Sequence, residues 1–175
     1  MTAVSTEDHK AASTEIGNFF LTDVYEQTLR AMLTKHAAHW AYWAPKTMVY
    51  PDRPSYLWDL HHLALRGHRQ SGKTEAIVRS VCQGDVVISY NTRTRDEFVR
   101  RLEERLGKDH GVYNHTAIGI KRLITAENPL ELYKPRHIWV DDALWVFDKK
   151  LDKRAFAKWV IDQYGHAVPT VISIG

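Results

Sequence analysis

Residues 67–74 read Gly67-His68-Arg69-Gln70-Ser71-Gly72-Lys73-Thr74. Two glycines, a lysine and a threonine occupy the fixed positions of the pattern G-x-x-x-x-G-K-[ST], which predicts a phosphate-binding loop. Gly67 and Gly72 permit backbone conformations that a side chain would forbid, so the amides can point inward. Such a loop gathers backbone N–H groups around the phosphates of a nucleotide. We therefore expect Lys73 to reach the β- and γ-phosphates and Thr74 to bind Mg²⁺.

The sequence on both sides of the loop has the order that a phosphate site needs. The apolar run Leu63-Ala64-Leu65 precedes it, as a buried parallel strand would. A helical pattern follows over residues 74–82, and Gly84 is a natural C-terminal stop. Strand, loop and helix together aim a helix N-terminus at an anion. We expect nine consecutive residues to contact the nucleotide: Gly67, His68, Arg69, Gln70, Ser71, Gly72, Lys73, Thr74 and Glu75.

Beyond the loop, strand and helix patterns alternate. Strands are predicted at 85–90, 137–141 and 170–174, helices at 96–106 and 152–164, a turn at 91–95, and one or two strands within 112–125. This alternation predicts an α/β fold with a mostly parallel central sheet covered by helices on both faces.

The N-terminal third divides into two segments before the core at 60–175. Residues 1–15 are polar and small, which predicts a flexible tail. Residues 16–59 form a helical and aromatic flank, in which helical spacing runs from Phe19 to about Trp43. The crowded Trp40, Tyr42 and Trp43 favour core or lid packing over a base-stacking platform. Prolines 45, 51 and 54 indicate an irregular crossing to the core.

Composition limits the class of protein. A chain of 175 residues with 44% apolar residues can form one domain with a sizeable core. The net charge of +3 permits a polyanionic partner without requiring one. Cys82 is the single cysteine, so an intrachain disulfide is excluded and a reducing cytoplasm is expected. We expect the Cys82 side chain to lie on a buried face of the helix. No apolar stretch approaches the ~20 residues that span a bilayer, so no membrane partner is expected.

Asp141 and Asp142 follow the apolar strand Ile138-Trp139-Val140. The carboxyl end of a parallel strand faces the ligand crevice, so Asp141 is a candidate Mg²⁺ ligand opposite Thr74. Asp142 is a candidate for orienting an attacking water. The alternative is a solvated turn, where aspartate is common.

A basic stretch follows the strand at 85–90. Arg93 and Arg95 are candidate phosphate-backbone contacts for a nucleic acid. Acidic residues interleave with the arginines, so the alternative is a solvated helix with internal salt bridges.

Four segments resemble a known group of motors. Arg69-Gln70-Ser71-Gly72-Lys73-Thr74 resembles the phosphate loop of viral terminase large-subunit ATPases. The strand at 86–90 with Asn91-Thr92-Arg93 resembles the next motif of terminases and superfamily 1 and 2 helicases. Residues 138–142 resemble their Walker B segment, and residues 170–174 resemble the strand carrying their coupling motif. The resemblance covers about Leu60 to Gly175.

The resemblance implies a three-layer P-loop NTPase that hydrolyses Mg-ATP to drive work on DNA, such as packaging or translocation. It implies catalytic roles for Lys73 and Arg69, with Arg69 sensing the γ-phosphate, and Mg²⁺ held by Thr74 and Asp141. Asp142 stands where the family usually has glutamate. A homo-oligomer or a partner subunit would supply a further arginine, and a viral protein would act in the host cytoplasm. A small nucleotide-type kinase and a nucleotide-binding interaction module with little turnover remain alternatives.

Overall fold

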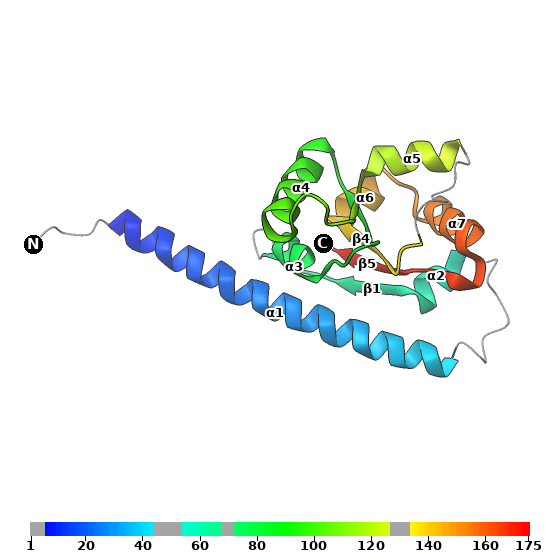
Figure 1. The fold of residues 1–175 in the computed structure, drawn as a ribbon, viewed down its shortest axis with the longest axis horizontal. Helices are drawn as coiled ribbons and strands as arrows, with labels where there is room; N and C mark the ends of the chain where they lie inside the picture. The colour runs from blue at the N-terminus through cyan, green and yellow to red at the C-terminus, as the bar shows by residue number, and fades with distance from the viewer. Residues whose placement is uncertain (1–5, 44–53, 68–71, 127–133) are drawn as a thin grey trace, which may run out of the picture.

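The computed structural model describes residues 6–43, 54–67, 72–126 and 134–175. Figure 1 shows its elements in chain order: α1 (Thr6–Trp43), α2 (Pro54–Leu60), β1 (His62–Leu65), α3 (Lys73–Ser80), β2 (Val86–Ser89), α4 (Thr92–Leu106), β3 (Tyr113–Thr116), α5 (Ala117–Thr125), β4 (His137–Asp141), α6 (Ala143–Lys149), α7 (Lys153–Tyr164), η1 (Gly165–Ala167) and β5 (Thr170–Ile174).

The five strands of the described residues form one sheet in the order β1-β5-β4-β2-β3, and every pair is parallel. The prediction of a mostly parallel α/β sheet is confirmed. The last strand of the chain, β5, lies between β1 and β4. It therefore separates the strand that enters the predicted phosphate loop from the strand that ends in Asp141.

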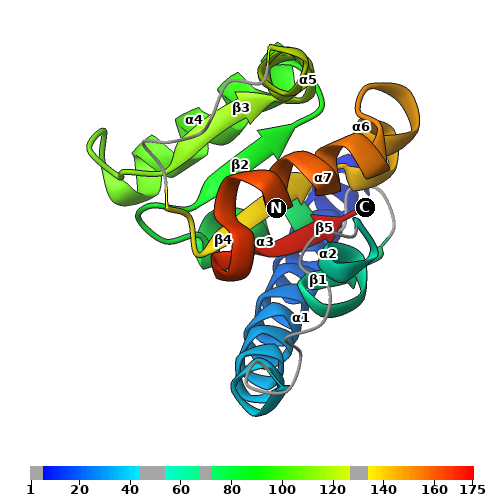
Figure 2. The same ribbon diagram turned by 90° about the vertical axis from the view of Figure 1, so that its right-hand side faces the viewer.

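Side chains alternate between the two faces of the sheet, as the period of a strand requires. Val86 and Ile88 of β2 pack in one apolar cluster with α2, α5, α6 and α7. Val87, between them, packs in a second cluster with α1, α3 and α4. Trp139 of β4 belongs to this second cluster as well. Two helical layers thus cover the sheet, as Figure 2 shows.

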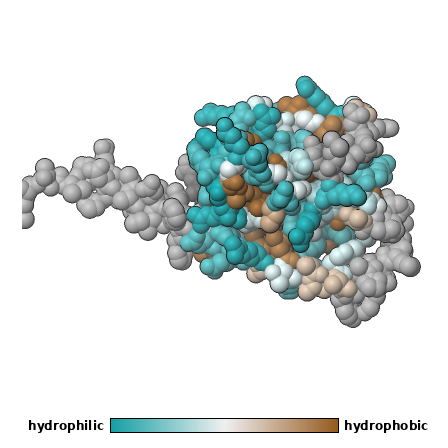
Figure 3. All heavy atoms as spheres, in the orientation of Figure 1, coloured by the Kyte–Doolittle hydropathy of each residue, from teal (hydrophilic) through white to brown (hydrophobic). Residues whose placement is uncertain are grey.

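Helix α1 runs antiparallel to β1. Tyr25 lies against Gly67, just after β1, whereas the His36 ring is 2.8 Å from the carbonyl oxygen of Leu60, just before it. The N-terminal part of α1 projects past the carboxyl ends of the strands, beyond the other elements (Figure 1). The surface in that view is mainly hydrophilic, with small apolar patches (Figure 3).

Several boundaries differ from the sequence predictions. Helix α1 begins at Thr6, so it includes most of the segment expected to be a flexible tail. The crossing after the prolines contains α2, which begins at Pro54, where a missing N–H costs a helix nothing. The segment 117–125 is helix rather than strand, because the Thr116 side chain accepts a hydrogen bond from the N–H of Gly119 and caps α5.

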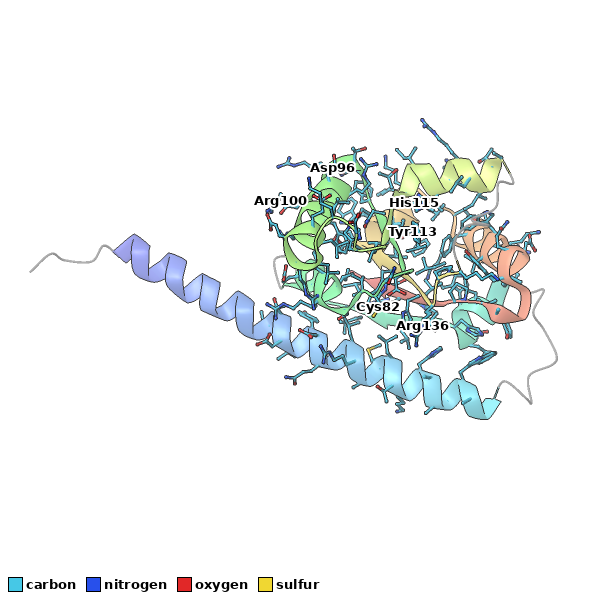
Figure 4. All side chains as sticks on the ribbon, in the orientation of Figure 1. Cys82, Asp96, Arg100, Tyr113, His115 and Arg136 are labelled. Atoms are coloured by element: carbon cyan, nitrogen blue, oxygen red, sulfur yellow. The ribbon has the colours of Figure 1, made fainter. Side chains whose placement is uncertain are left out.

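Two local predictions were wrong. Residues 92–95 form the first turn of α4 rather than a loop, since Asn91 and Thr94 make a reciprocal capping box. Cys82 is exposed rather than buried, because α3 ends at Ser80 and the chain turns away before the cysteine. Figure 4 shows Cys82 with the other labelled side chains.

Candidate functional site

The predicted phosphate loop joins β1 to α3, at the carboxyl edge of the sheet. Its first residue is held by the residue that follows the last strand, because the N–H of Gly67 donates to the carbonyl oxygen of Gly175 over 2.9 Å. Gly72, which precedes α3, has φ 77°, so a left-handed glycine is required there as the sequence predicted. Four predicted contacts lie outside the described residues: His68, Arg69, Gln70 and Ser71.

Gly67 is required for a steric reason and not for the special backbone conformation that the sequence predicted. Its φ is outside the left-handed region, in contrast to that of Gly72. A Cβ built on Gly67 would lie 2.0 Å from the hydroxyl oxygen of Tyr25 and 3.2 Å from Cδ of Lys73. Glycine is needed here because the α1 side chain occupies the space, and the sequence pattern alone did not single out Tyr25.

Lys73 and Thr74 are the first two residues of α3, and their side chains contact two different partners. The Lys73 ammonium donates to the carbonyl oxygen of Gly67 over 2.7 Å, which closes the two ends of the loop. The Thr74 hydroxyl lies 3.1 and 3.3 Å from the two carboxylate oxygens of Asp141, at the end of β4. The structure thus brings together the hydroxyl and the carboxylate that the sequence nominated as metal ligands.

Asp141 is a buried carboxyl group, 5% exposed. Burial, followed by the nearby charge of Asp142, raises its pKa to about 6. The Thr74 hydroxyl, the Asp142 N–H and the Lys73 ammonium act in the opposite direction and favour the carboxylate. A cation bound at this position would remove most of the cost of burying the charge.

Asp142 has φ 53° and ψ 45°, and it is the one non-glycine residue with a positive φ in the part of the chain that the structure describes. Its N–H donates to Oδ1 of Asp141 over 3.1 Å. Left-handed backbone costs a side-chain-bearing residue energy and recurs at functional sites. This conformation turns the chain from β4 directly into α6.

Glu75 is the predicted nucleotide contact that the structure places among arginines. Its carboxylate lies 3.3 Å from Nε of Arg79 and 3.7 Å from a guanidinium nitrogen of Arg101. Arg79 also pairs with Asp23 over 2.9 Å. These ion pairs join α3 to α1 and α4, with Glu75 in the first turn of α3 and Arg79 in its last turn.

Arg93 and Arg95, the predicted nucleic-acid contacts, lie on the first turn of α4. The Arg93 side chain is exposed, and the Arg95 guanidinium donates to the Asp96 carboxylate over 2.7 Å. Arg93 and Asp96 line an open depression with Arg100. In Figure 4 Asp96 and Arg100 lie on the outer side of α4. Both signs of charge are therefore present on this surface.

Ser89 is a polar residue of the site that the sequence reasoning did not single out. It is 1% exposed and ends β2, next to the strand that ends in Asp141. The available signal was a hydroxyl at the end of the apolar run Val86-Val87-Ile88.

Within the described ranges, no group of three or more His, Cys, Asp or Glu side chains is placed to hold a metal ion. None of the helices in those ranges combines the length and apolarity needed to cross a membrane. Comparison with protein-family models, with curated proteins and with solved structures found no match.

Proposed function

We propose that this chain is a P-loop NTPase that binds Mg-ATP and hydrolyses it. The observation that carries the proposal is the contact of 3.1 Å between the Thr74 hydroxyl and the Asp141 carboxylate. These groups lie 67 residues apart in the sequence, and the sequence predicted both of them as ligands of the same ion. The position of β5 between β1 and β4 agrees with the class of P-loop protein in which a further strand separates these two.

The start of α3 supplies the binding energy for phosphates. Backbone N–H groups at a helix N-terminus carry partial positive charge, and the left-handed Gly72 turns the chain into that helix. The Lys73 ammonium already lies across the loop, bound to the Gly67 carbonyl. An incoming β- or γ-phosphate would replace that carbonyl as its acceptor, which is a stronger charge-assisted contact.

The donor set at Thr74 and Asp141 fits Mg²⁺. A hydroxyl and a carboxylate are hard oxygen ligands, and Mg²⁺ commonly takes one or two protein oxygens together with waters and phosphate oxygens. When bound, the ion would neutralise charge that develops on the phosphates. Asp141 and Thr74 would hold it at the carboxyl edge of β4.

Hydrolysis follows as an in-line displacement. The oxygen of a water forms a bond to the γ-phosphorus while the bond from phosphorus to the bridging oxygen breaks, giving ADP, inorganic phosphate and a proton released to solvent. Lys73 would stabilise the negative charge of the transferring group, and Asp142 would orient the water. The resemblance to terminase ATPases adds Arg69 as a second cation at the γ-phosphate.

We further propose that turnover is coupled to DNA. The support is the resemblance, the net charge of +3 and the position of Arg93 and Arg95 on the exposed first turn of α4. Because Arg95 is paired with Asp96, binding of a DNA phosphate would have to compete with that ion pair.

Steady-state ATP hydrolysis with and without double-stranded DNA tests the proposal. We expect Lys73→Ala to lower turnover by about 100-fold or more, since it removes a charge made for the transition state. Lys121→Ala, on the exposed surface of α5, is the matched control and should behave as wild type. A fluorescent ATP analogue, titrated with Mg²⁺ or with EDTA, measures binding separately.

Three outcomes are informative. DNA-stimulated turnover that is lost in Lys73→Ala supports the motor. Lys73-dependent binding without turnover would reduce the proposal to a nucleotide-binding module. Absence of Mg-ATP binding in the wild-type chain would refute the proposed site.

A further inference from the structure

Ser89 lies directly beside Asp141 on the neighbouring strand. The parallel register pairs Val86 with Ile138 and Ile88 with Val140, so the next step along β2 and β4 places Ser89 beside Asp141. Adjacent strands are about 4.8 Å apart. The two side chains therefore start from neighbouring positions at the carboxyl edge of the sheet.

Both side chains also point to the same face. Val87 and Trp139 pack in the apolar cluster with α3, and side chains two residues further along a strand return to that face. Ser89 and Asp141 are those residues. This is the face on which the Thr74 hydroxyl approaches Asp141 from α3.

The Ser89 hydroxyl is buried and unsatisfied. The residue is 1% exposed, and Oγ has no hydrogen-bond partner in the described structure. Most buried polar side-chain atoms in proteins are paired with protein groups or ordered water. A hydroxyl left over next to a carboxylate is suited to a small polar occupant such as water.

The strand order decides on which side of Asp141 this hydroxyl lies. The sheet runs β1-β5-β4-β2, so the phosphate loop follows β1 on one side of Asp141 and Ser89 lies on the other. A phosphate chain cradled by the loop would approach Asp141 from the side of β1. The in-line water must stand on the side of the γ-phosphorus opposite the leaving oxygen. For a phosphate chain that runs from the end of β1 toward Asp141, that side is the side of Ser89.

We propose that Ser89 is a positioning residue for hydrolysis, and that its hydroxyl holds the attacking water between β2 and the carboxylates at the end of β4. The inference rests on the proposed ATPase. Ser89 can accept a hydrogen bond from that water or donate one to it, and it takes no part in the covalent step. Asp142 is about one methylene shorter than the glutamate usual in terminase ATPases. The Ser89 hydroxyl would be a second group that, together with Asp142, fixes the position of the water.

The test is ATP hydrolysis by Ser89→Ala, analysed for kcat and KM separately. Misplacing a reacting group by ~1 Å costs about 100-fold in rate, so we expect kcat to fall by roughly 10- to 100-fold. KM and the affinity for a fluorescent Mg-ATP analogue should stay within about 2-fold, because the hydroxyl acts on the water and not on the bound nucleotide. Ser89→Thr keeps the hydroxyl and should restore most of kcat.

Ser80→Ala is the matched control. Its Oγ is another buried hydroxyl oxygen without a partner in the described structure, but it lies at the opposite end of α3 from Thr74. We expect this variant to hydrolyse ATP at the wild-type rate. Thermal unfolding of all three variants shows whether a lower kcat results from loss of the bound water or from loss of the folded structure.

The outcomes separate this inference from the proposed function. An unchanged kcat in a folded Ser89→Ala protein overturns the role of Ser89 and leaves the ATPase intact. A rise in KM at constant kcat overturns it too, since that result indicates ground-state binding. A wild-type chain that binds no Mg-ATP, or binds it without turnover, overturns hydrolysis and the role of Ser89 together.

Discussion

Replacing Gly67 with alanine tests why a glycine begins the loop. The new Cβ would lie 2.0 Å from Oη and 2.8 Å from Cζ of Tyr25, and real Cβ contacts essentially never fall below 3.0 Å. Carbon contacts are comfortable at about 3.5 Å, so the tyrosine must retreat by more than about 1 Å. The ring is half-buried and packs against the apolar cluster that includes α3, so its movement would disturb that packing. Overpacking of this kind costs about 1–3 kcal/mol.

A double-mutant cycle isolates the contact. Tyr25→Ala removes both the hydroxyl and the ring carbons, so Gly67→Ala should cost less than about 1 kcal/mol in that background, and the remainder reflects Cδ of Lys73 at 3.2 Å. Free energies of unfolding from urea denaturation of the four proteins give the coupling. Thermal midpoints should follow at about 2–4 °C per kcal/mol.

Two outcomes would contradict a steric requirement for glycine at position 67. If Gly67→Ala costs the same with and without the tyrosine ring, the requirement for glycine lies in the backbone or in the loop itself. If Gly67→Ala is as stable as wild type, contact with the end of the Tyr25 side chain does not require a glycine at this position.

Three further predictions concern the scaffold around the site. Trp139→Phe removes the hydrogen bond of 2.9 Å that the indole donates to the buried Asp85 carboxylate, and the free energy of unfolding in urea should fall by about 1.5–3 kcal/mol; a change below about 0.5 kcal/mol would count against this bond. Burial lowers the pKa of His61 from 6.5 to about 4, so the unfolded chain takes up a proton in this window before the folded one does. His61 should therefore contribute a loss of roughly 3 kcal/mol between pH 6.5 and 4, measured in urea denaturation as the difference between the pH profiles of wild type and His61→Phe. Asn91→Ala breaks the capping box with Thr94 and should cost about 1 kcal/mol in thermal unfolding, with Asn91→Asp as the variant that retains a capping oxygen.

The strands were the most predictable part of the fold. Strands β1, β2, β4 and β5 each contain a short apolar run, and burial on both faces of a parallel sheet selects such runs. The edge strand β3 has no such run. Helices α2 and α5 were missed because their sequences are short and their starts depend on capping by Thr116 or on Pro54. Propensity over so few residues is a weak signal compared with one well-placed cap.

The parts of the candidate site that consist of residues close together in the sequence could be predicted. The contacts between distant segments could not. The loop from Gly67 to Thr74 and the acidic pair at the end of β4 are visible as patterns of neighbouring residues. Tyr25 lies 42 residues before the glycine whose side-chain space it fills, and no spacing in the sequence indicates that contact. Arg95 was expected in a turn, but it lies on the first turn of α4 and pairs with Asp96, as in the alternative of a helix with internal salt bridges.

The sequence by itself determined the order of strand, loop and helix around residues 67–74 and the polar residues that end the strands. These are short-range properties, because periodicity, turns and caps involve residues a few positions apart. The tertiary structure alone decided that Thr74 contacts Asp141, that Tyr25 fills the space beside Gly67, and that Ser89 stands next to Asp141. The physical reason is that strand order and helix packing follow from the burial of apolar faces by segments far apart in the chain, and local patterns leave that choice open.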